Sequence, residues 1–312
     1  MSTRLNLRLG TRGSDLARTQ SGTIAAALQQ AGFDVELTII KTAGDQNTTA
    51  SFGSIGPQGV FVREIEQALV ERRVELAVHS FKDLPTTSPA ELTIAAVPAR
   101  IDPADLLLVR RSALAHDVGD WLPLKPGARV GTASARRRVW LTHFRSDLVI
   151  EPLRGNVPTR IRKLAEGGFD AIVLAAAGVE RLQATHRLDG ALAGIEVVRL
   201  DPTRFVPAPA QGALAVQCRR DNGAVLAALA RIDDAPSRAA VTAERDALAR
   251  AEGGCDVAFG AYCVAHAGVH GGTHELIAMH ERAGNVRAAR VQGHDVRALG
   301  AAVWAKLDGE PT

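Results

Sequence analysis

The chain has 312 residues, of which 46% are apolar and 23% are charged, a balance typical of a folded globular protein. Its 37 basic and 34 acidic side chains leave a net charge of only +3, which is weak for a protein that binds nucleic acid through its overall charge. No run of about 18 uncharged apolar residues is present, which excludes a membrane-spanning helix. The N-terminal sequence MSTRLNLRLG has no apolar core and the chain has three cysteines, so we expect no secretion signal and a cytoplasmic location.

The N-terminal third alternates strand and helix patterns. Residues 4–10 alternate apolar and polar side chains, which predicts a half-buried strand, and Ser14 is placed to cap a helix over 15–30. Further strands are predicted over 35–41 and 76–79, with a helical apolar face between them that is formed by Phe61, Ile65, Ala68 and Leu69. This alternation predicts an α/β lobe with a mainly parallel sheet.

The same alternation returns after about residue 105. Strands are predicted over 106–109, 128–131, 148–150 and 171–174, and helices over 134–144 and 157–166. Two prolines at 207 and 209 precede a strand over 213–218 that has no partner in its own neighbourhood. We expect this strand to return to the first sheet.

The pattern changes from Pro236 onward. A helix is predicted over 237–251, three strands over 261–266, 275–280 and 286–292, and a final helix over 295–307. The fold class predicted is therefore two α/β lobes with mainly parallel sheets and a small C-terminal α+β domain. The expected boundaries are 1–100 with 200–220 returning, 105–198, and 221–312.

Basic and hydroxyl residues follow four of the predicted strands. In α/β sheets ligands gather at the carboxyl ends of strands, and cationic groups beside helix starts bind carboxylates or phosphates. The four clusters are 11–14, 79–85, 131–138, and 154–156 with Arg160 one turn later. A solvated helix face is the alternative for 136–138. Nucleic acid is the competing anion, opposed by the small net charge and by the lack of aromatic residues among the arginines.

Two single residues have open interpretations. Asp83 is an acid next to Lys82, and it is either an ion-pair partner or a group that stabilises a cation and moves protons. Cys255 follows two glycines and is a candidate nucleophile or attachment point, whereas Cys218 and Cys263 lie in apolar strands and are predicted to be core residues. The nine histidines show no metal-ligand spacing, so no metal site is predicted.

Six motifs, in order along residues 7–260, resemble those of hydroxymethylbilane synthase, a family also called porphobilinogen deaminase. They are T-R-x-S-x-L-A at 11–17, H-S-x-K-D-x-P at 79–85, R-R at 136–137, L-R-G-N-x-x-T-R at 153–160, Q-G-A at 211–213 and E-G-G-C at 252–255. The resemblance implies two lobes like those of periplasmic binding proteins and a third small domain. It also implies a monomeric transferase of porphyrin and heme biosynthesis, with no nucleic-acid or membrane partner.

The resemblance further implies the reaction and its residues. Family members join four porphobilinogen molecules head to tail, release ammonia at each step and yield the linear tetrapyrrole hydroxymethylbilane. They carry a dipyrromethane cofactor on a thioether, which the motif places at Cys255, and the motif makes Asp83 the catalytic residue that stabilises an azafulvene cation. The implied cofactor- and substrate-binding residues are Arg12, Ser14, Ser80, Lys82, Thr132, Ser134, Arg136, Arg137, Arg154, Gly155, Asn156 and Arg160, with Gln20, Gln58, Phe61, Arg181 and Gln211 as additional candidates. Each substrate bears an acetate and a propionate, which suits these donors.

The chain departs from the family pattern in three places. Gln58 stands where the family often has lysine, Ala43 where it has arginine, and Ala258 where it has proline. The alternative function is a cytosolic two-lobed anion-binding protein without catalysis. A second alternative is an anion-sensing regulatory domain, but no helix-turn-helix pattern precedes the lobes. A covalent cofactor, seen in the intact mass, would distinguish the enzyme from both.

Overall fold

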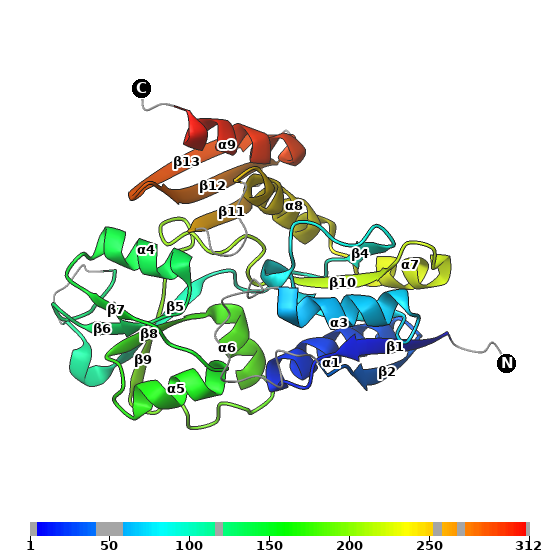
Figure 1. Cartoon of the computed structure of the whole chain (residues 1–312), viewed down its shortest axis with the longest axis horizontal. Coiled ribbons are helices and arrows are strands. Elements are labelled where there is room, and N and C mark those ends of the chain that lie inside the picture. Colours follow the sequence, from blue (N-terminus) through cyan, green and yellow to red (C-terminus); the bar gives the residue numbers. More distant parts are fainter. Residues whose placement is uncertain (1–4, 42–58, 116–120, 252–257, 267–271, 310–312) are drawn as a thin grey trace. The chain divides into compact units, whose positions relative to one another are not determined.

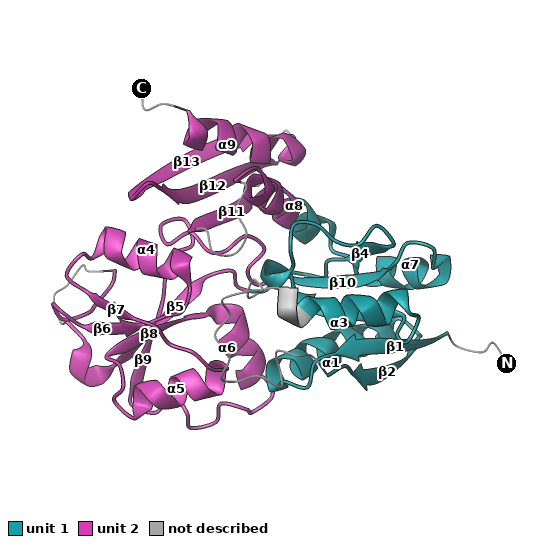
Figure 2. Ribbon diagram, in the orientation of Figure 1, with its two compact units in different colours: residues 1–101, 213–239 teal, residues 102–212, 240–312 magenta. Residues whose placement is uncertain are grey.

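The structure is a computed structural model that describes residues 5–41, 59–115, 121–251, 258–266 and 272–309. The chain divides into two compact units, residues 1–101 with 213–239 and residues 102–212 with 240–312 (Figure 2). The helix α8 (Ala235–Arg250) passes from the first unit into the second. The three predicted domain boundaries remain a prediction.

The first unit contains a five-stranded sheet in the order β2-β1-β3-β10-β4; Figure 1 labels β1, β2, β4 and β10 of this sheet. Its strands are β1 (Asn6–Thr11), β2 (Asp34–Ile39), β3 (Leu76–Ser80), β4 (Leu92–Ala96) and β10 (Leu214–Arg219). The first three are parallel, and β10 is antiparallel to both β3 and β4, so four strands share one direction. The expected return of the late strand to the first sheet is confirmed.

Amphipathic helices cover this sheet because their apolar faces need burial. In α1 (Asp15–Gln30) the side chains of Ile24 and Leu28 are buried in one cluster with Leu7 and Leu9 of β1. The other helical segments are α3 (Gly59–Val70), the single turn η1 (Phe81–Asp83), α7 (Gly223–Leu229) and η3 (Ala230–Ile232).

The second unit contains a second five-stranded sheet with the same plan, in the order β7-β6-β8-β5-β9. Its strands are β5 (Asp105–Arg110), β6 (Arg129–Gly131), β7 (Val149–Glu151), β8 (Ala171–Ala175) and β9 (Ile195–Arg199). Here β5 is the antiparallel strand, between β8 and β9. The helical segments are η2 (Arg111–Ala113), α4 (Ala135–Phe144), α5 (Val157–Ala165) and α6 (Ala176–Gln183).

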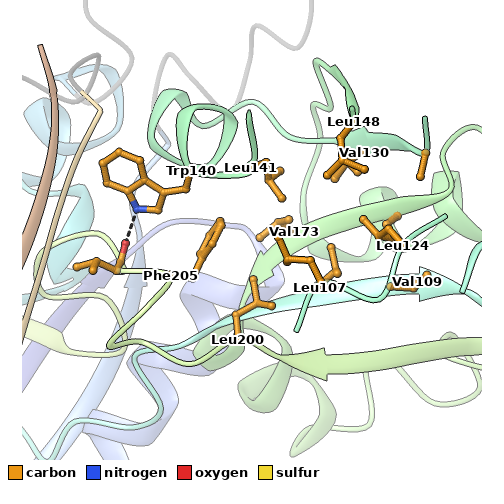
Figure 3. Close-up of a cluster of buried hydrophobic side chains, with 14 of the residues drawn as sticks. Leu107, Val109, Leu124, Val130, Trp140, Leu141, Leu148, Val173, Leu200 and Phe205 are labelled. Carbon is orange, nitrogen blue, oxygen red and sulfur yellow. Dashed lines mark hydrogen bonds between the residues drawn. The ribbon is translucent and has the colours of Figure 1, made fainter. Parts of the chain in front are cut away.

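The core of this second lobe joins the sheet to α4 and to the chain after β9. Leu107 and Val173 on the sheet pack in one buried cluster with Trp140 and Phe205 (Figure 3). The buried Trp140 Nε1 donates a hydrogen bond of 2.9 Å to the carbonyl of Val206, which satisfies the polar end of the indole.

The second unit also holds a three-stranded antiparallel sheet of β11 (Phe259–His266), β12 (Thr273–Arg282) and β13 (Asn285–Gly293). The hairpin between β12 and β13 turns through Ala283 and Gly284, both at positive φ, as a type I′ two-residue turn requires. The turn η4 (Val296–Ala298), the helix α9 (Leu299–Asp308) and α8 bury a cluster that contains Cys263, so its predicted core role is confirmed, as it is for Cys218 in β10.

The predicted fold class is confirmed, and each predicted helix and strand is present with ends shifted by a few residues. The sequence analysis missed β4, β9, α6 and α7. These elements are short, and β9 exposes most of its side chains as an edge strand, so no strong periodic pattern marks it. No helix among the described residues is long and apolar enough to cross a membrane.

Candidate anion-binding and catalytic site

In the first unit, the predicted site residues lie at the carboxyl ends of two adjacent strands. β1 ends in the turn that carries Arg12 and Ser14, and β3 ends at Ser80. Ser14 caps α1, since its Oγ accepts a hydrogen bond of 3.4 Å from the Ala17 N–H. Gln20 Nε2 on α1 donates to Ser80 Oγ at 2.8 Å, so the helix and the second strand end are joined directly.

A buried polar chain anchors the second strand end. Gln217 Nε2 donates to Glu66 Oε1 at 2.9 Å, so its amide oxygen is left to accept from His79 Nε2–H at 3.1 Å. Burial lowers the pKa of His79 to about 4 and raises the pKa of Glu66. His79 is therefore neutral at pH 7 and holds the strand that presents Ser80, Lys82 and Asp83.

Asp83 ends the single helical turn after β3 and is exposed. It forms no hydrogen bond or ion pair with any residue in the described part of the chain. Lys82, the residue before it, is half-buried. A structural ion pair is thus not what fixes Asp83. Its carboxylate is accessible to a cationic group of a ligand.

In the second unit, α4 begins directly after β6 and carries the arginine pair. Ser134 caps this helix by accepting from the Arg137 N–H, and Thr132 Oγ1 accepts from the Ser134 N–H at 3.2 Å. Arg136 and Arg137 are only 5% and 6% exposed. The solvated helix face considered for 136–138 is therefore wrong for these two and holds only for the exposed Arg138.

The arginine pair shares one buried carboxylate. Asp105, fully buried at the start of β5, accepts from Arg136 Nη2 at 2.7 Å and from Arg137 Nη2 and Nε at 2.7 and 3.1 Å. Arg136 Nη1 donates to the Val206 carbonyl at 2.8 Å, and Arg137 Nη1 donates to the Val173 carbonyl at 3.0 Å. Burial alone would raise the pKa of Asp105, but the two guanidinium charges outweigh it and hold that pKa well below its usual range.

The sequence analysis missed Asp105. It opens an apolar strand run, and the only signal that could have found it is a lone acid at the edge of an otherwise buried strand. Its one negative charge leaves the arginine pair with a net charge of +1. Arg136 Nε is buried and has no hydrogen-bond partner among the described residues.

Further donors follow β7. Asn156 caps α5 by accepting from the Thr159 N–H at 2.9 Å, and Gly155 adopts φ +118°, where an added Cβ would lie 2.9 Å from a Thr159 methyl. Arg160 Nε donates to the Gly155 carbonyl at 2.7 Å. The pKa of Arg160 is lowered, mainly by burial and to a smaller extent by the nearby positive charge of Arg137. The side chain of Arg154 is exposed.

Arg181 and Gln211, the two additional candidates in this unit, both donate hydrogen bonds within it. Arg181 Nη2 on α6 donates to the Gly212 carbonyl at 2.9 Å, and burial lowers its pKa to about 10. Gln211 Nε2 donates to Asp105 Oδ1 at 2.9 Å, so it belongs to the arginine cluster. Of the other predicted residues, Cys255 and Gln58 lie outside the described residues, as does the side chain of Phe61.

Taken separately, the first unit presents an accessible carboxylate among polar strand ends, and the second gathers buried arginines with excess positive charge. These features define an α/β protein whose side-chain charges suit carboxylate-bearing anions.

Residues 7–227 match the family described as "Porphobilinogen deaminase, dipyromethane cofactor binding domain". A porphobilinogen deaminase of Syntrophobacter fumaroxidans is 42% identical over 303 residues, which cover 93% of this chain and 92% of that protein. One of Mycobacterium leprae is 46% identical over 256 residues, 82% of this chain and 76% of that protein. The chain therefore belongs to the porphobilinogen deaminase family.

Among solved structures, an ancestral cationic amino acid solute-binding protein aligns with a TM-score of 0.44 and 14% identity, over 73% of this chain and 88% of that chain. This likeness is too weak to add to the family assignment, which rests on the sequence matches.

Proposed function

We propose that this chain joins four porphobilinogen molecules head to tail, with loss of ammonia at each step, and that Asp83 is its catalytic carboxylate. The reaction follows from membership in the family, whose product is the linear tetrapyrrole hydroxymethylbilane. The observation that supports the role of Asp83 is its exposed carboxylate on the turn that follows β3, which has no partner among the described residues.

The arginines of the second unit suit a ligand rich in carboxylates. Each porphobilinogen unit brings two carboxylates, so the product of each step is more anionic than the one before. Arg136 and Arg137 keep a net positive charge after pairing with Asp105, and Arg160 and Arg181 add two more. Charge-assisted bonds of this kind contribute about 1.5–3 kcal/mol each.

The same residues fit the dipyrromethane cofactor of the family. The buried Arg136 Nε without a partner is a donor that a cofactor carboxylate can take, and Arg137 and Arg160 supply positive charge beside it. When bound, the dipyrromethane supplies the pyrrole carbon to which the first substrate unit is joined. We assign its thioether to Cys255 on the E-G-G-C motif, which lies outside the described residues.

Asp83 has two tasks in the substrate chemistry. When the C–N bond of the porphobilinogen aminomethyl group breaks, ammonia leaves and positive charge develops on the pyrrole and its methylene carbon. The Asp83 carboxylate stabilises that cation. When the new carbon–carbon bond forms, a proton leaves the attacking pyrrole carbon, and Asp83 accepts it and passes it on.

The protein is proposed to act as a cytoplasmic monomer on this small molecule. The net charge of +3 supports the absence of a nucleic-acid partner. Size-exclusion chromatography with light scattering checks the monomer, and a mass of two chains would contradict it.

Substitution of Asp83 by Asn tests the central assignment. The change keeps the size of the side chain and removes its charge, so single-turnover release of ammonia should slow by about 10²–10⁴-fold. Because Asp83 has no described partner, the unfolding midpoint should not move. The matched control is Asp221→Asn, which removes an exposed acid paired with Arg72 in the same unit and should leave the rate unchanged. A rate for Asp83→Asn within a few-fold of the unaltered protein would contradict the assignment.

The alternative, an anion-binding protein without catalysis, is tested on the unaltered protein. The enzyme has an intact mass above its sequence mass by one dipyrromethane, and it consumes porphobilinogen. A protein that matches its sequence mass after incubation with porphobilinogen and consumes none would be the binding protein.

A further inference from the structure

The stretch from Val206 to Gly212, here called the connecting segment, bonds both to the C-terminal sheet and to the arginine pair. The Ala261 N–H of β11 donates to the Pro207 carbonyl at 3.0 Å. One residue earlier, the Val206 carbonyl accepts from Arg136 Nη1 at 2.8 Å and from Trp140 Nε1 at 2.9 Å. All these residues belong to the second unit.

The C-terminal sheet and the connecting segment pack closely. Gly260 of β11 has no room for a side chain, because an added Cβ would lie 2.7 Å from the Val206 carbonyl oxygen and 3.0 Å from that of Pro207. Both obstacles are backbone atoms and cannot rotate away.

Glu244 of α8 holds the other end of this segment. Its side chain is fully buried, and its two carboxylate oxygens accept from two backbone donors. Oε2 accepts from the Ala210 N–H at 2.7 Å, and Oε1 accepts from the Cys263 N–H of β11 at 2.8 Å. One carboxylate thus ties the connecting segment to the C-terminal sheet.

The bond to Ala210 acts at a point of unusual backbone. Ala210 is fully buried at φ 61°, a left-handed conformation that residues other than glycine rarely adopt. The next residue, Gln211, reaches Asp105 Oδ1 at 2.9 Å and the carbonyls of Pro103 and Ala104 at 2.8 and 3.1 Å. The turn at Ala210 therefore sets where the Gln211 amide meets the carboxylate that aligns both arginines.

We propose that Glu244 is a positioning residue for the arginine site, acting through Ala210 and Gln211 on Asp105 and the arginine pair. The proposal rests on the proposed function, in which that pair binds carboxylates. Glu244 lies in α8, the helix that precedes Cys255 in the sequence. No ligand contact is assigned to Glu244 itself.

Substitution of Glu244 by Gln removes one of its two acceptors, because an amide has one oxygen. One backbone N–H is then left facing an NH₂ group in a buried place. A hydrogen bond to a charged acceptor corresponds to about tenfold or more in an equilibrium constant. We expect the KM for porphobilinogen to rise about tenfold, and the apoprotein to gain its covalent mass more slowly when incubated with porphobilinogen.

A second substitution separates positioning from simple stabilisation. Glycine adopts positive φ without strain, so Ala210→Gly keeps the turn in place when Glu244 no longer holds it. In the double variant Glu244→Gln/Ala210→Gly, the raised KM should fall most of the way back and the loading rate should be largely restored. If Glu244 only stabilises the C-terminal sheet through Cys263, the double variant will show no recovery.

The control is Asp246→Asn on the same helix, whose carboxylate pairs with the exposed Arg250. It should leave KM and loading unchanged. An unchanged KM in Glu244→Gln, or a raised KM that Ala210→Gly does not lower, would overturn the proposal. Failure of the proposed function looks different, since the unaltered protein would then neither gain mass nor consume porphobilinogen.

Discussion

Replacement of Asp105 by Asn removes the one carboxylate that two buried arginines share. Among the described residues, Asp105 accepts three side-chain hydrogen bonds from the arginine pair and one from Gln211. Asn has nearly the same volume, so the change leaves no cavity. It removes the negative charge and puts an NH₂ group where a donor already points.

The magnitude follows from the burial of all three charges. Asp105 is 0% exposed, and Arg136 and Arg137 are 5% and 6% exposed. Loss of one partner from a buried ion pair costs about 3–5 kcal/mol because the remaining charge is not solvated. Here two guanidinium groups remain, and they also repel each other. We therefore expect the free energy of unfolding to fall by about 3–5 kcal/mol, a large share of the ~5–15 kcal/mol that a folded protein has.

Urea unfolding followed by tryptophan fluorescence measures this change. The chain has three tryptophans, Trp121, Trp140 and Trp304, and all of them lie in the second unit with Asp105. The signal therefore reports on the affected part of the chain.

The control is Glu151→Gln, which breaks an ion pair with Arg129 in the same unit whose side chains are 35% and 50% exposed. An exposed pair contributes about 0–1 kcal/mol, and salt screens it. The Asp105 effect should persist in high salt. A loss below about 1 kcal/mol for Asp105→Asn, or a loss equal to that of Glu151→Gln, would refute the buried-triad reasoning.

Three further predictions concern the cofactor, pH and packing. Cys255→Ala should abolish both the covalent added mass and turnover, and an adduct that survives would place the thioether elsewhere. Burial lowers the pKa of His79 to about 4, so the folded state excludes a proton that the unfolded chain takes up below about pH 6.5. As the pH is lowered from about 6.5 to about 4, the free energy of unfolding should therefore fall by up to about 1.4 kcal/mol per pH unit. Urea unfolding at several pH values measures this slope, and His79→Gln should flatten it. Gly260→Ala should destabilise the protein by about 1–3 kcal/mol, because the added Cβ would meet the Val206 carbonyl. The control is Gly22→Ala on α1, which should not destabilise the protein because a Cβ there meets nothing within 4 Å. Equal unfolding midpoints for the two variants would contradict the packing argument.

Much of the site follows from local sequence, because strand ends and helix starts are local features. Ser14, Ser134 and Asn156 each cap a helix directly after a strand, and the accompanying arginines lie within a turn of those caps. Such clusters are visible wherever an apolar strand run ends in polar residues. The family motifs then add the reaction.

The partners of those residues come from distant parts of the chain and could not be predicted. Asp105 meets arginines 31 and 32 positions later and the amide of Gln211 106 positions later. His79 finds its acceptor on Gln217, 138 residues away. These contacts depend on which strands become neighbours, and the two antiparallel strands β5 and β10 are inserted beside strands remote in sequence.

The sequence by itself determined the alternation of strands and helices, the class of fold and the family, since hydrophobic periodicity and short motifs are written in consecutive residues. Only the tertiary structure decided that the two arginines are buried rather than solvated, that one carboxylate balances them, and that Glu244 ties the C-terminal sheet to their support. The physical reason is that burial and charge pairing are properties of a residue's surroundings in space. Those surroundings are assembled from strands and helices far apart in the chain.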